Sequence, residues 1–183
     1  MNGILIVEGP DGAGKTTLIN QLREHWLFKT RYMHLRVHKE MEKWHCATAR
    51  RAIRLSKDYL VILDRHWPSE QIYSYERSPG PSYDPTNMVD WLKSHGAIYI
   101  WAIPEDYQRL IEEHKTRREE RHEEYHDISN VVKRYYDHWY GTYEGPDNYL
   151  KKIQPLNKRD DFIRYDRFTD KDILDKIIDR LRP

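Results

Sequence analysis

The segment GPDGAGKT at residues 9–16 decides how the rest of this 183-residue sequence is interpreted. It fits the pattern G-x-x-x-x-G-K-[ST], and it lies between the short apolar run Ile4–Val7 and the helix-like stretch Lys15–Trp26. A glycine-rich turn between a strand and a helix gathers backbone N–H groups and the positive end of a helix dipole around one anion. The sequence therefore predicts a loop that binds the phosphates of a nucleoside triphosphate.

Two side chains of this loop have expected roles. Lys15 would reach the β- and γ-phosphate oxygens, and the hydroxyl of Thr16 would ligate Mg²⁺. The simplest alternative is a glycine-rich turn that binds nothing. We favour phosphate binding because the segment has the strand, turn and helix context that the motif requires.

Five short apolar or β-branched runs are expected to form strands. They are Ile4–Val7, Tyr32–Val37, Leu60–Leu63, Ala97–Ile103 and Phe162–Tyr165. The first, third and fourth runs lack apolar/polar alternation, as expected of parallel strands that helices cover on both faces. Between the third and fourth runs, Asp84 as N-cap and Pro85 as first helical residue predict a helix that ends at Gly96. The order of elements predicts a three-layer α/β/α fold around a five-stranded parallel sheet.

Composition limits the class of protein. A length of 183 residues favours a single domain over residues 1–183. The 31 Lys+Arg and 30 Asp+Glu residues give a net charge of +1, so we expect neither a nucleic-acid partner nor a membrane partner. The single Cys46 cannot form an internal disulfide, and the run Ile4–Val7 is too short for a signal peptide. We therefore expect a cytoplasmic protein.

A second polar cluster follows the third predicted strand, where Leu63 is followed by Asp64, Arg65 and His66. This position is the carboxyl edge of the sheet, where ligands of α/β proteins bind. Asp64 can hold Mg²⁺ through water or accept the proton of an attacking oxygen, and Arg65 can grip a phosphate with two parallel hydrogen bonds. The alternative is a salt bridge at the end of a strand.

Three motifs resemble the thymidylate kinase family. They are EGPDGAGKTT at residues 8–17, D-R-H-x-x-S-x-Q-x-Y at residues 64–73 and Leu-Arg-Val at residues 35–37, which lacks the proline of the family's segment. The resemblance implies a sheet of order 2-3-1-4-5 and transfer of the γ-phosphoryl group of ATP, with Mg²⁺, to a deoxynucleoside monophosphate. It also implies a homodimer. The nucleotide-binding residues that it implies are Gly9, Asp11, Gly12, Ala13, Gly14, Lys15, Thr16 and Thr17.

The resemblance also implies an acceptor site. Asp11 would contact the sugar 3′-hydroxyl and orient the phosphate-binding arginines, Arg36 and Arg65 would hold the acceptor phosphate, and Tyr73 would pack under the sugar. The base-binding arginine of the family lies on the helix before the third strand, where Arg50 is favoured over Arg51 and Arg54. The acceptor-binding residues expected in this way are Asp11, Arg36, Arg50, Arg65, Ser69, Glu70 and Tyr73.

A run of charged residues at 112–124 coincides with the lid of such kinases, expected here at residues 114–126. Family members supply a catalytic arginine either from the phosphate loop or from the lid. Because the loop position is Gly12, we expect the cation from Arg117, Arg118 or Arg121, where it would offset charge on the transferring phosphoryl group. The alternative is a solvated helix with pairs such as Glu113 and Arg117.

Position 70 departs from the family, which often has Asn or Thr there. An ionised carboxylate only accepts hydrogen bonds, so Glu70 would select a base edge with N–H groups, such as thymine N3–H or guanine N1–H with its amino group. If buried, Glu70 would need an arginine such as Arg50 to offset its desolvation. It could instead point to solvent or pair with a lid arginine. We expect dTMP first, with dGMP or a modified pyrimidine nucleotide as alternatives.

Three other functions stay open at this stage. A nucleoside kinase has a neutral hydroxyl as acceptor, which Arg36 and Arg65 together disfavour. A kinase acting on a base or an end within DNA would need a basic stripe, against which the balanced charge argues. A non-catalytic nucleotide-binding module would bind nucleotide without turnover on any acceptor.

Overall fold

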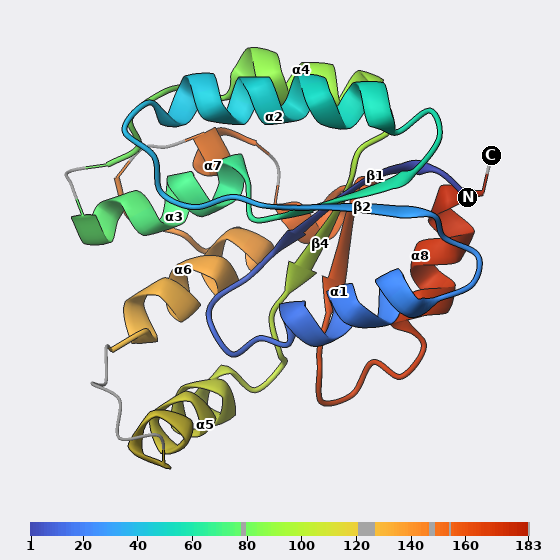
Figure 1. Cartoon of the computed structure of the whole chain (residues 1–183). Coiled ribbons are helices and arrows are strands. Elements are labelled where there is room, and N and C mark those ends of the chain that lie inside the picture. The colour runs from blue at the N-terminus through green and yellow to red at the C-terminus, as the bar shows by residue number, and fades with distance from the viewer. Residues whose placement is uncertain (78–79, 121–126, 147–148, 154, 183) are drawn as a thin grey trace.

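The computed structural model describes residues 1–77, 80–120, 127–146, 149–153 and 155–182. Its sheet has five parallel strands in the order β2-β3-β1-β4-β5 (Figure 1). The strands are β1 (Gly3–Glu8), β2 (Thr30–His34), β3 (Leu60–Asp64), β4 (Ile98–Ala102) and β5 (Phe162–Tyr165). The predicted sheet and its order are thereby confirmed.

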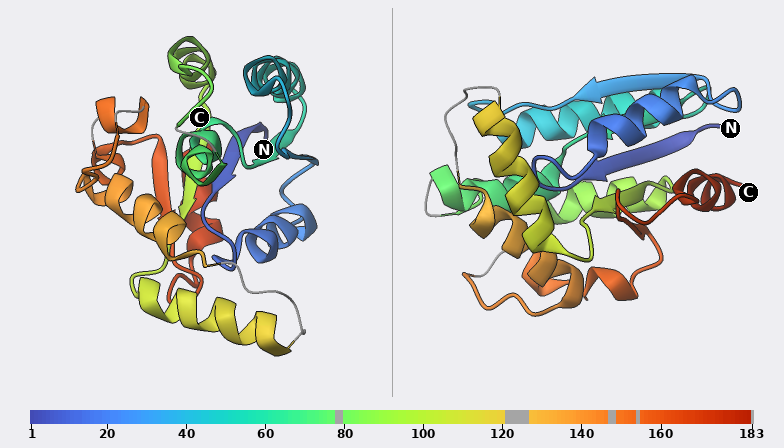
Figure 2. Two further views of the ribbon diagram at one scale, coloured as in Figure 1. Left: turned by 90° about the vertical axis from the view of Figure 1, so that its left-hand side faces the viewer. Right: turned by 90° about the horizontal axis from the view of Figure 1, so that it is seen from below.

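Helices cover both faces of this sheet (Figure 2). One face carries α2 (Met41–Leu55), α3 (Trp67–Arg77), α4 (Thr86–Ser94), α6 (Ser129–Tyr140), α7 (Tyr149–Lys152) and the 3₁₀ turn η1 (Leu156–Lys158). The other face carries α1 (Lys15–Glu24), α5 (Tyr107–Glu120) and α8 (Ile173–Leu181). The result is the expected three-layer α/β/α arrangement.

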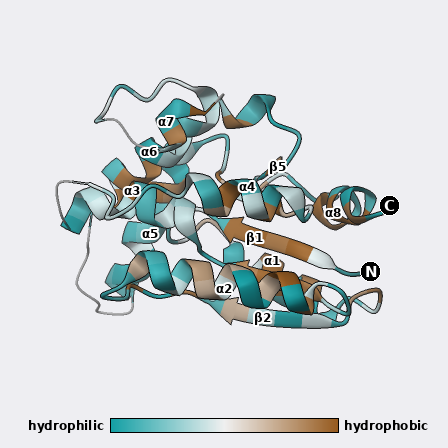
Figure 3. Cartoon of the chain, turned by 90° about the horizontal axis from the view of Figure 1, so that it is seen from above, coloured by the Kyte–Doolittle hydropathy of each residue, from teal (hydrophilic) through white to brown (hydrophobic). Residues whose placement is uncertain are grey.

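The central strand β1 shows why these layers form. Ile4 and Ile6 pack into the core on one face of the sheet, and Leu5 and Val7 pack into the core on the other. Successive side chains of a strand point to opposite faces, so a strand buried on both sides needs an unbroken apolar run. Figure 3 shows this apolar strand between helices with hydrophilic outer surfaces.

The first of two boundary differences concerns the edge strand. The run predicted at Tyr32–Val37 is a strand over Thr30–His34, because its partner β3 ends at Asp64, which is in register with His34. The backbone N–H of Leu35 makes one more bond to the carbonyl of Asp64, at 3.0 Å, before the chain leaves the sheet.

The second boundary difference concerns two helix termini. Helix α1 ends at Glu24 and not at Trp26, whose side chain is 85% exposed. Helix α4 begins at Thr86, so Pro85 takes the N-cap position and the Asp84 carboxylate accepts the Thr86 N–H at 2.9 Å. The predicted capping acceptor therefore lies one residue further from the helix than expected.

The carboxyl ends of β1 and β3 open at the same edge of the sheet, while both chain termini lie at the opposite end (Figure 1). The glycine-rich loop follows β1, and Asp64 ends β3. Polar side chains from distant parts of the sequence therefore meet at one edge. Among the described residues, no helix combines the length and the apolar character needed to cross a bilayer.

Candidate active site

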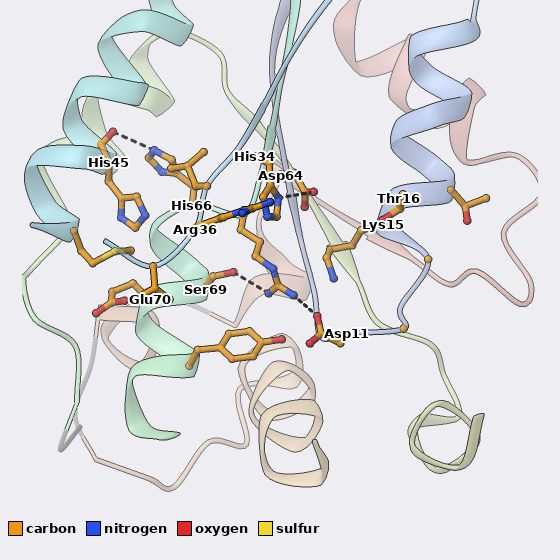
Figure 4. A pocket seen from close by; sticks show the side chains of 18 of the residues that line it. Asp11, Lys15, Thr16, His34, Arg36, His45, Asp64, His66, Ser69 and Glu70 are labelled. Atoms are coloured by element: carbon orange, nitrogen blue, oxygen red, sulfur yellow. Dashed lines mark hydrogen bonds and ion pairs between the residues drawn. The ribbon is translucent and has the colours of Figure 1, made fainter. Parts of the chain in front are cut away.

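The main pocket of the described chain lies at this carboxyl edge and has a volume of about 740 Å³. Figure 4 shows Lys15 and Thr16 at one end and His45 and Glu70 at the other, with Asp64 and Ser69 between them. Its wall contains these residues: Asp11, Gly12, Gly14, Lys15, Thr16, Thr17, His34, Leu35, Arg36, Val37, Met41, His45, Asp64, Arg65, His66, Ser69, Glu70, Tyr73, Arg77, Arg117 and Arg167. The volume is in the range of small-molecule sites.

The glycine-rich loop owes its shape to two left-handed residues. Gly12 and Gly14 have φ angles of +79° and +86°, which residues with a Cβ rarely adopt. Gly14 is the N-cap of α1 and has no side chain, so the first N–H groups of the helix have no capping partner and are available to an anion. The predicted residues Gly9 and Ala13 lie behind the loop, with Ala13 in the core.

Lys15 is almost completely buried at the start of α1, with 8% of its surface exposed. Its ammonium group donates a hydrogen bond to the Pro10 carbonyl at 2.7 Å. Burial, assisted by the positive charge of Arg65, lowers the pKa of Lys15 to about 8. A phosphate in the pocket would supply the negative charge that this desolvated cation lacks.

Asp64 lies at the end of β3 with one carboxylate oxygen bound and one free. Its Oδ2 accepts bonds from the Tyr32 hydroxyl at 2.8 Å and from His34 Nδ1 at 2.9 Å. Its Oδ1 is buried without a hydrogen-bond partner among the described residues. Thr16 in the same pocket offers a hydroxyl oxygen, and oxygen groups of these two kinds fit Mg²⁺, which takes oxygen ligands and keeps several waters.

Arg65 stands between the loop and α3. Its guanidinium donates to the Asp11 carboxylate at 2.5 Å, to the Gly9 carbonyl at 3.4 Å and to the Ser69 hydroxyl at 3.5 Å. It also lies over the Tyr73 ring, 4.8 Å from the ring centre. The backbone of Arg65 has a φ of +67°, the one left-handed non-glycine conformation among the described residues. The structure brings Asp11 and Arg65 together, as the resemblance implies.

The carboxylate of Glu8 supports the turn at Arg65 through hydrogen bonds, a role that the sequence did not indicate. Its carboxylate is fully buried and accepts the His66 backbone N–H at 2.5 Å, the Ser69 hydroxyl at 2.5 Å and the Tyr135 hydroxyl at 3.3 Å. Burial raises the pKa of Glu8 to about 7, even though these bonds and Arg65 act in the other direction. Glu8, the last residue of β1, thus fixes the segment that follows Arg65 through hydrogen bonds to His66 and Ser69.

At the end of the pocket farther from Lys15, the structure does not place Arg50 in the wall, where the prediction needs it. This residue is exposed and is not in the pocket wall, because the inner face of α2 is formed by His45, Ala49 and Ala52. Arg51 and Arg54 are exposed as well. The structure does not bring Arg50 into the pocket wall, where His45 lies instead, and a base-binding role of Arg50 stays a prediction.

Glu70 is buried in the pocket wall but has partners other than those expected. Arg77 donates to it at 2.8 Å and Ser82 at 3.1 Å. Among the described residues Arg50 is not a partner of Glu70, and the alternative of a solvent-exposed carboxylate is wrong. The alternative of a pair with a lid arginine stays open for Arg121, which lies outside the described residues. Arg77 lies seven residues after Glu70, two helical turns along α3, a spacing that identifies the pair only once the helix is known.

Two further arginines line the pocket. Arg117 on α5 and Arg167 after β5 are in the wall, and Glu113 binds both of them, Arg117 at 3.2 Å. Arg118 is outside the wall, and Arg121 lies outside the described residues. Within the expected lid, 114–120 belong to α5 and 121–126 are not described, so the lid stays a prediction.

Two residues of the wall, His34 and Arg167, had no role in the sequence analysis. His34 ends β2 and binds Asp64 together with Tyr32, and Arg167 follows β5 at the same sheet edge. Both lie at or shortly after the carboxyl end of a strand, so polar residues at the other strand ends were the available signal. His45 gave no comparable signal, because a histidine inside a helix is more often part of a core.

The parallel sheet of order 2-3-1-4-5, with a phosphate-binding type of loop after its central strand, defines a P-loop kinase-like fold. The YorR protein of Bacillus subtilis, crystallised in complex with phosphorylated GDP, has a similar structure. The TM-score is 0.63 and the sequence identity is 18%, over 96% of this chain and 93% of YorR. No protein-family model and no curated protein matches the sequence. At this identity the likeness establishes the fold.

Proposed function

We propose that this protein transfers the γ-phosphoryl group of ATP to the phosphate of a deoxynucleoside monophosphate. One observation carries the proposal: Arg65 is held by Asp11 of the loop inside the same pocket that contains Lys15. A desolvated ammonium on one side and a fixed guanidinium on the other suit two phosphate groups that meet end to end.

Each group of the pocket has a role in this reaction. The N–H groups at the start of α1 and the Lys15 ammonium would bind the β- and γ-phosphates. Thr16 and the free oxygen of Asp64 would hold Mg²⁺, which offsets phosphate charge when bound. Arg117 would supply a further cation at the transferring group, with Arg118 and Arg121 as the other candidates. Closure of 114–126 would exclude water.

The transfer step needs no proton acceptor. An oxygen of the acceptor phosphate forms a bond to the γ-phosphorus while the bond from that phosphorus to the β,γ-bridging oxygen breaks. The bridging oxygen keeps the electron pair and leaves as part of ADP, and the acceptor becomes the diphosphate. Because the second pKa of a phosphate monoester is about 6, the attacking oxygen is already ionised at neutral pH. We therefore favour the metal-holding role of Asp64 over a role as general base.

The acceptor is proposed to be a monophosphate because two guanidinium groups, Arg65 and Arg36, lie in the wall on the acceptor side. A nucleoside would give these cations nothing to bind. The ligand named for YorR is a guanine nucleotide, which supports nucleotide chemistry in this fold. The family resemblance puts dTMP first, with dGMP or a modified pyrimidine nucleotide next. A homodimer remains part of the proposal.

The test is ADP release from ATP, measured across a panel of deoxy- and ribonucleoside monophosphates. We expect turnover only with a deoxynucleoside monophosphate, and we expect Arg65→Ala to lower kcat/KM for the acceptor by roughly 10²-fold or more, because a half-buried charged hydrogen-bond donor is lost. The matched control is Arg54→Ala, an exposed arginine on α2 outside the pocket.

Other outcomes would identify other functions. Normal turnover by Arg65→Ala at all acceptor concentrations would contradict the acceptor assignment. Turnover on nucleosides would indicate a nucleoside kinase, and salt-dependent binding and phosphorylation of DNA would indicate a DNA kinase. Nucleotide binding without any turnover would indicate a non-catalytic module.

A further inference from the structure

The carboxylate of Glu70 forms a hydrogen-bond acceptor in the wall of the acceptor end. Only 4% of the residue is exposed, and it lines the cavity. Arg77 donates to Oε2 and Ser82 donates to Oε1, which fixes the orientation of the carboxylate and offsets its charge. A carboxylate has about four lone-pair sites, and Arg77 and Ser82 take about two of them in the described part of the chain.

The surroundings of Glu70 suit an uncharged ring. His45 lies at the same end of the cavity (Figure 4), and Met41 is also part of the cavity wall. Burial lowers the pKa of His45 to about 4, so its ring is neutral at pH 7. His66, whose pKa burial also lowers well below its usual value, lies against it with the ring centres 4.7 Å apart. Both rings are uncharged and cannot attract a phosphate, whereas a flat heterocycle can pack against them.

We infer that Glu70 reads the base of the acceptor and that this base is guanine, an inference that rests on the proposed phosphoryl transfer to a nucleoside monophosphate. An ionised carboxylate accepts hydrogen bonds and cannot donate them. Guanine presents two adjacent donors, N1–H and the 2-amino group, to its two oxygens. The base therefore differs from thymine, which the family resemblance puts first.

The other bases present a carbonyl or a ring lone pair next to their donor. Thymine has N3–H between two carbonyl oxygens, so a two-oxygen contact would bring a carbonyl against the carboxylate. Cytosine and adenine each have an amino group beside an unprotonated ring nitrogen. A buried carboxylate facing an acceptor would be left unpaired, which is the basis of strong discrimination by polar sites.

The main competing role is structural. Through Ser82 and Arg77, Glu70 joins the segment that precedes α4 to the end of α3, and this alone would account for its burial. A structural role predicts equal weakening of all nucleotides when Glu70 changes. Base reading predicts a change confined to nucleotides with guanine's donors.

The first experiment uses the unaltered protein. Equilibrium binding is measured by calorimetry for dGMP, dIMP, dTMP, dCMP and dAMP, and ADP release is measured with the same nucleotides. We expect dGMP to bind best and dIMP, which lacks the 2-amino group, to bind roughly tenfold or more weakly, because one charged hydrogen bond is lost. Tighter binding of any other base, or equal binding of dGMP and dIMP, would overturn the inference.

The second experiment compares Glu70→Gln with Glu76→Gln. Glu76 is an exposed carboxylate of the same helix, pairs with Arg134 and is not in the pocket wall. Glu70→Gln should bring the dGMP/dIMP ratio of binding constants close to one, while Glu76→Gln keeps it. A retained ratio in Glu70→Gln would overturn the inference. Base preference is decided by binding alone, so selective dGMP binding without turnover would count against phosphoryl transfer and for base reading.

Discussion

The part of the pocket proposed to bind ATP, the donor half, and the part proposed to bind the monophosphate, the acceptor half, are built from different segments of the chain. The donor half comes mainly from the backbone of one continuous segment, residues 9–17, with glycines in left-handed conformations. The acceptor half consists of side chains from β2, α2, β3 and α3, held by ion pairs and hydrogen bonds such as Arg65 with Asp11 and Glu70 with Arg77. One half depends on backbone shape, and the other depends on which side chains meet.

This difference determines how each half responds to mutation. Backbone donors at a helix N-terminus cannot be removed by changing a side chain, so the donor half has few sensitive side chains, with Lys15 chief among them. In the acceptor half, the loss of one partner leaves another buried charge unpaired. We therefore expect single large effects in the donor half and coupled effects in the acceptor half.

The largest effect is expected for Lys15→Ala. Its buried ammonium would contact the β- and γ-phosphates, where charge changes during transfer. We expect kcat/KM to fall by roughly 10³-fold or more with every acceptor, measured by coupled ADP release. Thr17→Ser, which keeps the hydroxyl, should change kcat/KM little. If kcat/KM fell with some acceptors only, Lys15 would act on the acceptor, and the proposed difference between the two halves would be contradicted.

The sequence predicted most of the fold and the position of the glycine-rich loop. An unbroken apolar run such as Ile4–Val7 is sufficient to identify a strand covered on both faces, and the spacing of glycines and Lys15 is fixed by backbone geometry. Both signals are local in sequence. The end of β2 was less accurately predicted, because an edge strand stops where its neighbour stops, and only the pairing with Asp64 fixes that position.

The acceptor half was predicted less well because its contacts are not local. The choice of Arg50 required the rotation of α2 about its axis, and the structure turns His45 inward and Arg50 outward. The partner of Glu70 was predicted wrongly for the same reason. Arg65 was the exception, because it directly follows Asp64 at a strand end, where a side chain meets the ligand edge in this class of fold.

An intermediate effect is expected from the buried carboxylate beneath Arg65. The pKa of Glu8 rises from 4.5 to about 7 on folding, so between these values the folded state keeps a proton that the unfolded state has released. The free energy of unfolding contributed by Glu8 should be fully present below about pH 4.5 and should be lost as the pH rises through about 7. Relative to Glu8→Gln, the unaltered protein should lose about 2–3 kcal/mol between pH 5 and pH 8.

Urea unfolding of both proteins at several pH values measures this difference, and the subtraction removes the titration of groups that the two proteins share. Glu24→Gln, an exposed carboxylate at the end of α1, is the control and should show no such pH dependence. If the difference between Glu8→Gln and the unaltered protein is constant with pH, then Glu8 is ionised throughout and does not carry the proton. If Glu8→Gln weakened acceptor binding and left the affinity for ATP unchanged, Glu8 would support the acceptor half alone.

The smallest effect concerns side-chain pairs in the pocket wall. Glu113 binds Arg117 and Arg167, both of which line the pocket, and its carboxylate would compete with a triphosphate for them. Because Glu113 is partly exposed, each pair contributes little, and Glu113→Gln should lower the KM for ATP by about two- to fivefold without changing the KM for the acceptor. Initial rates at saturating acceptor measure this change, with the exposed neighbour Glu112→Gln as control. A higher KM for ATP would mean that Glu113 positions these arginines for the nucleotide, and the donor half would then depend on paired side chains as the acceptor half does.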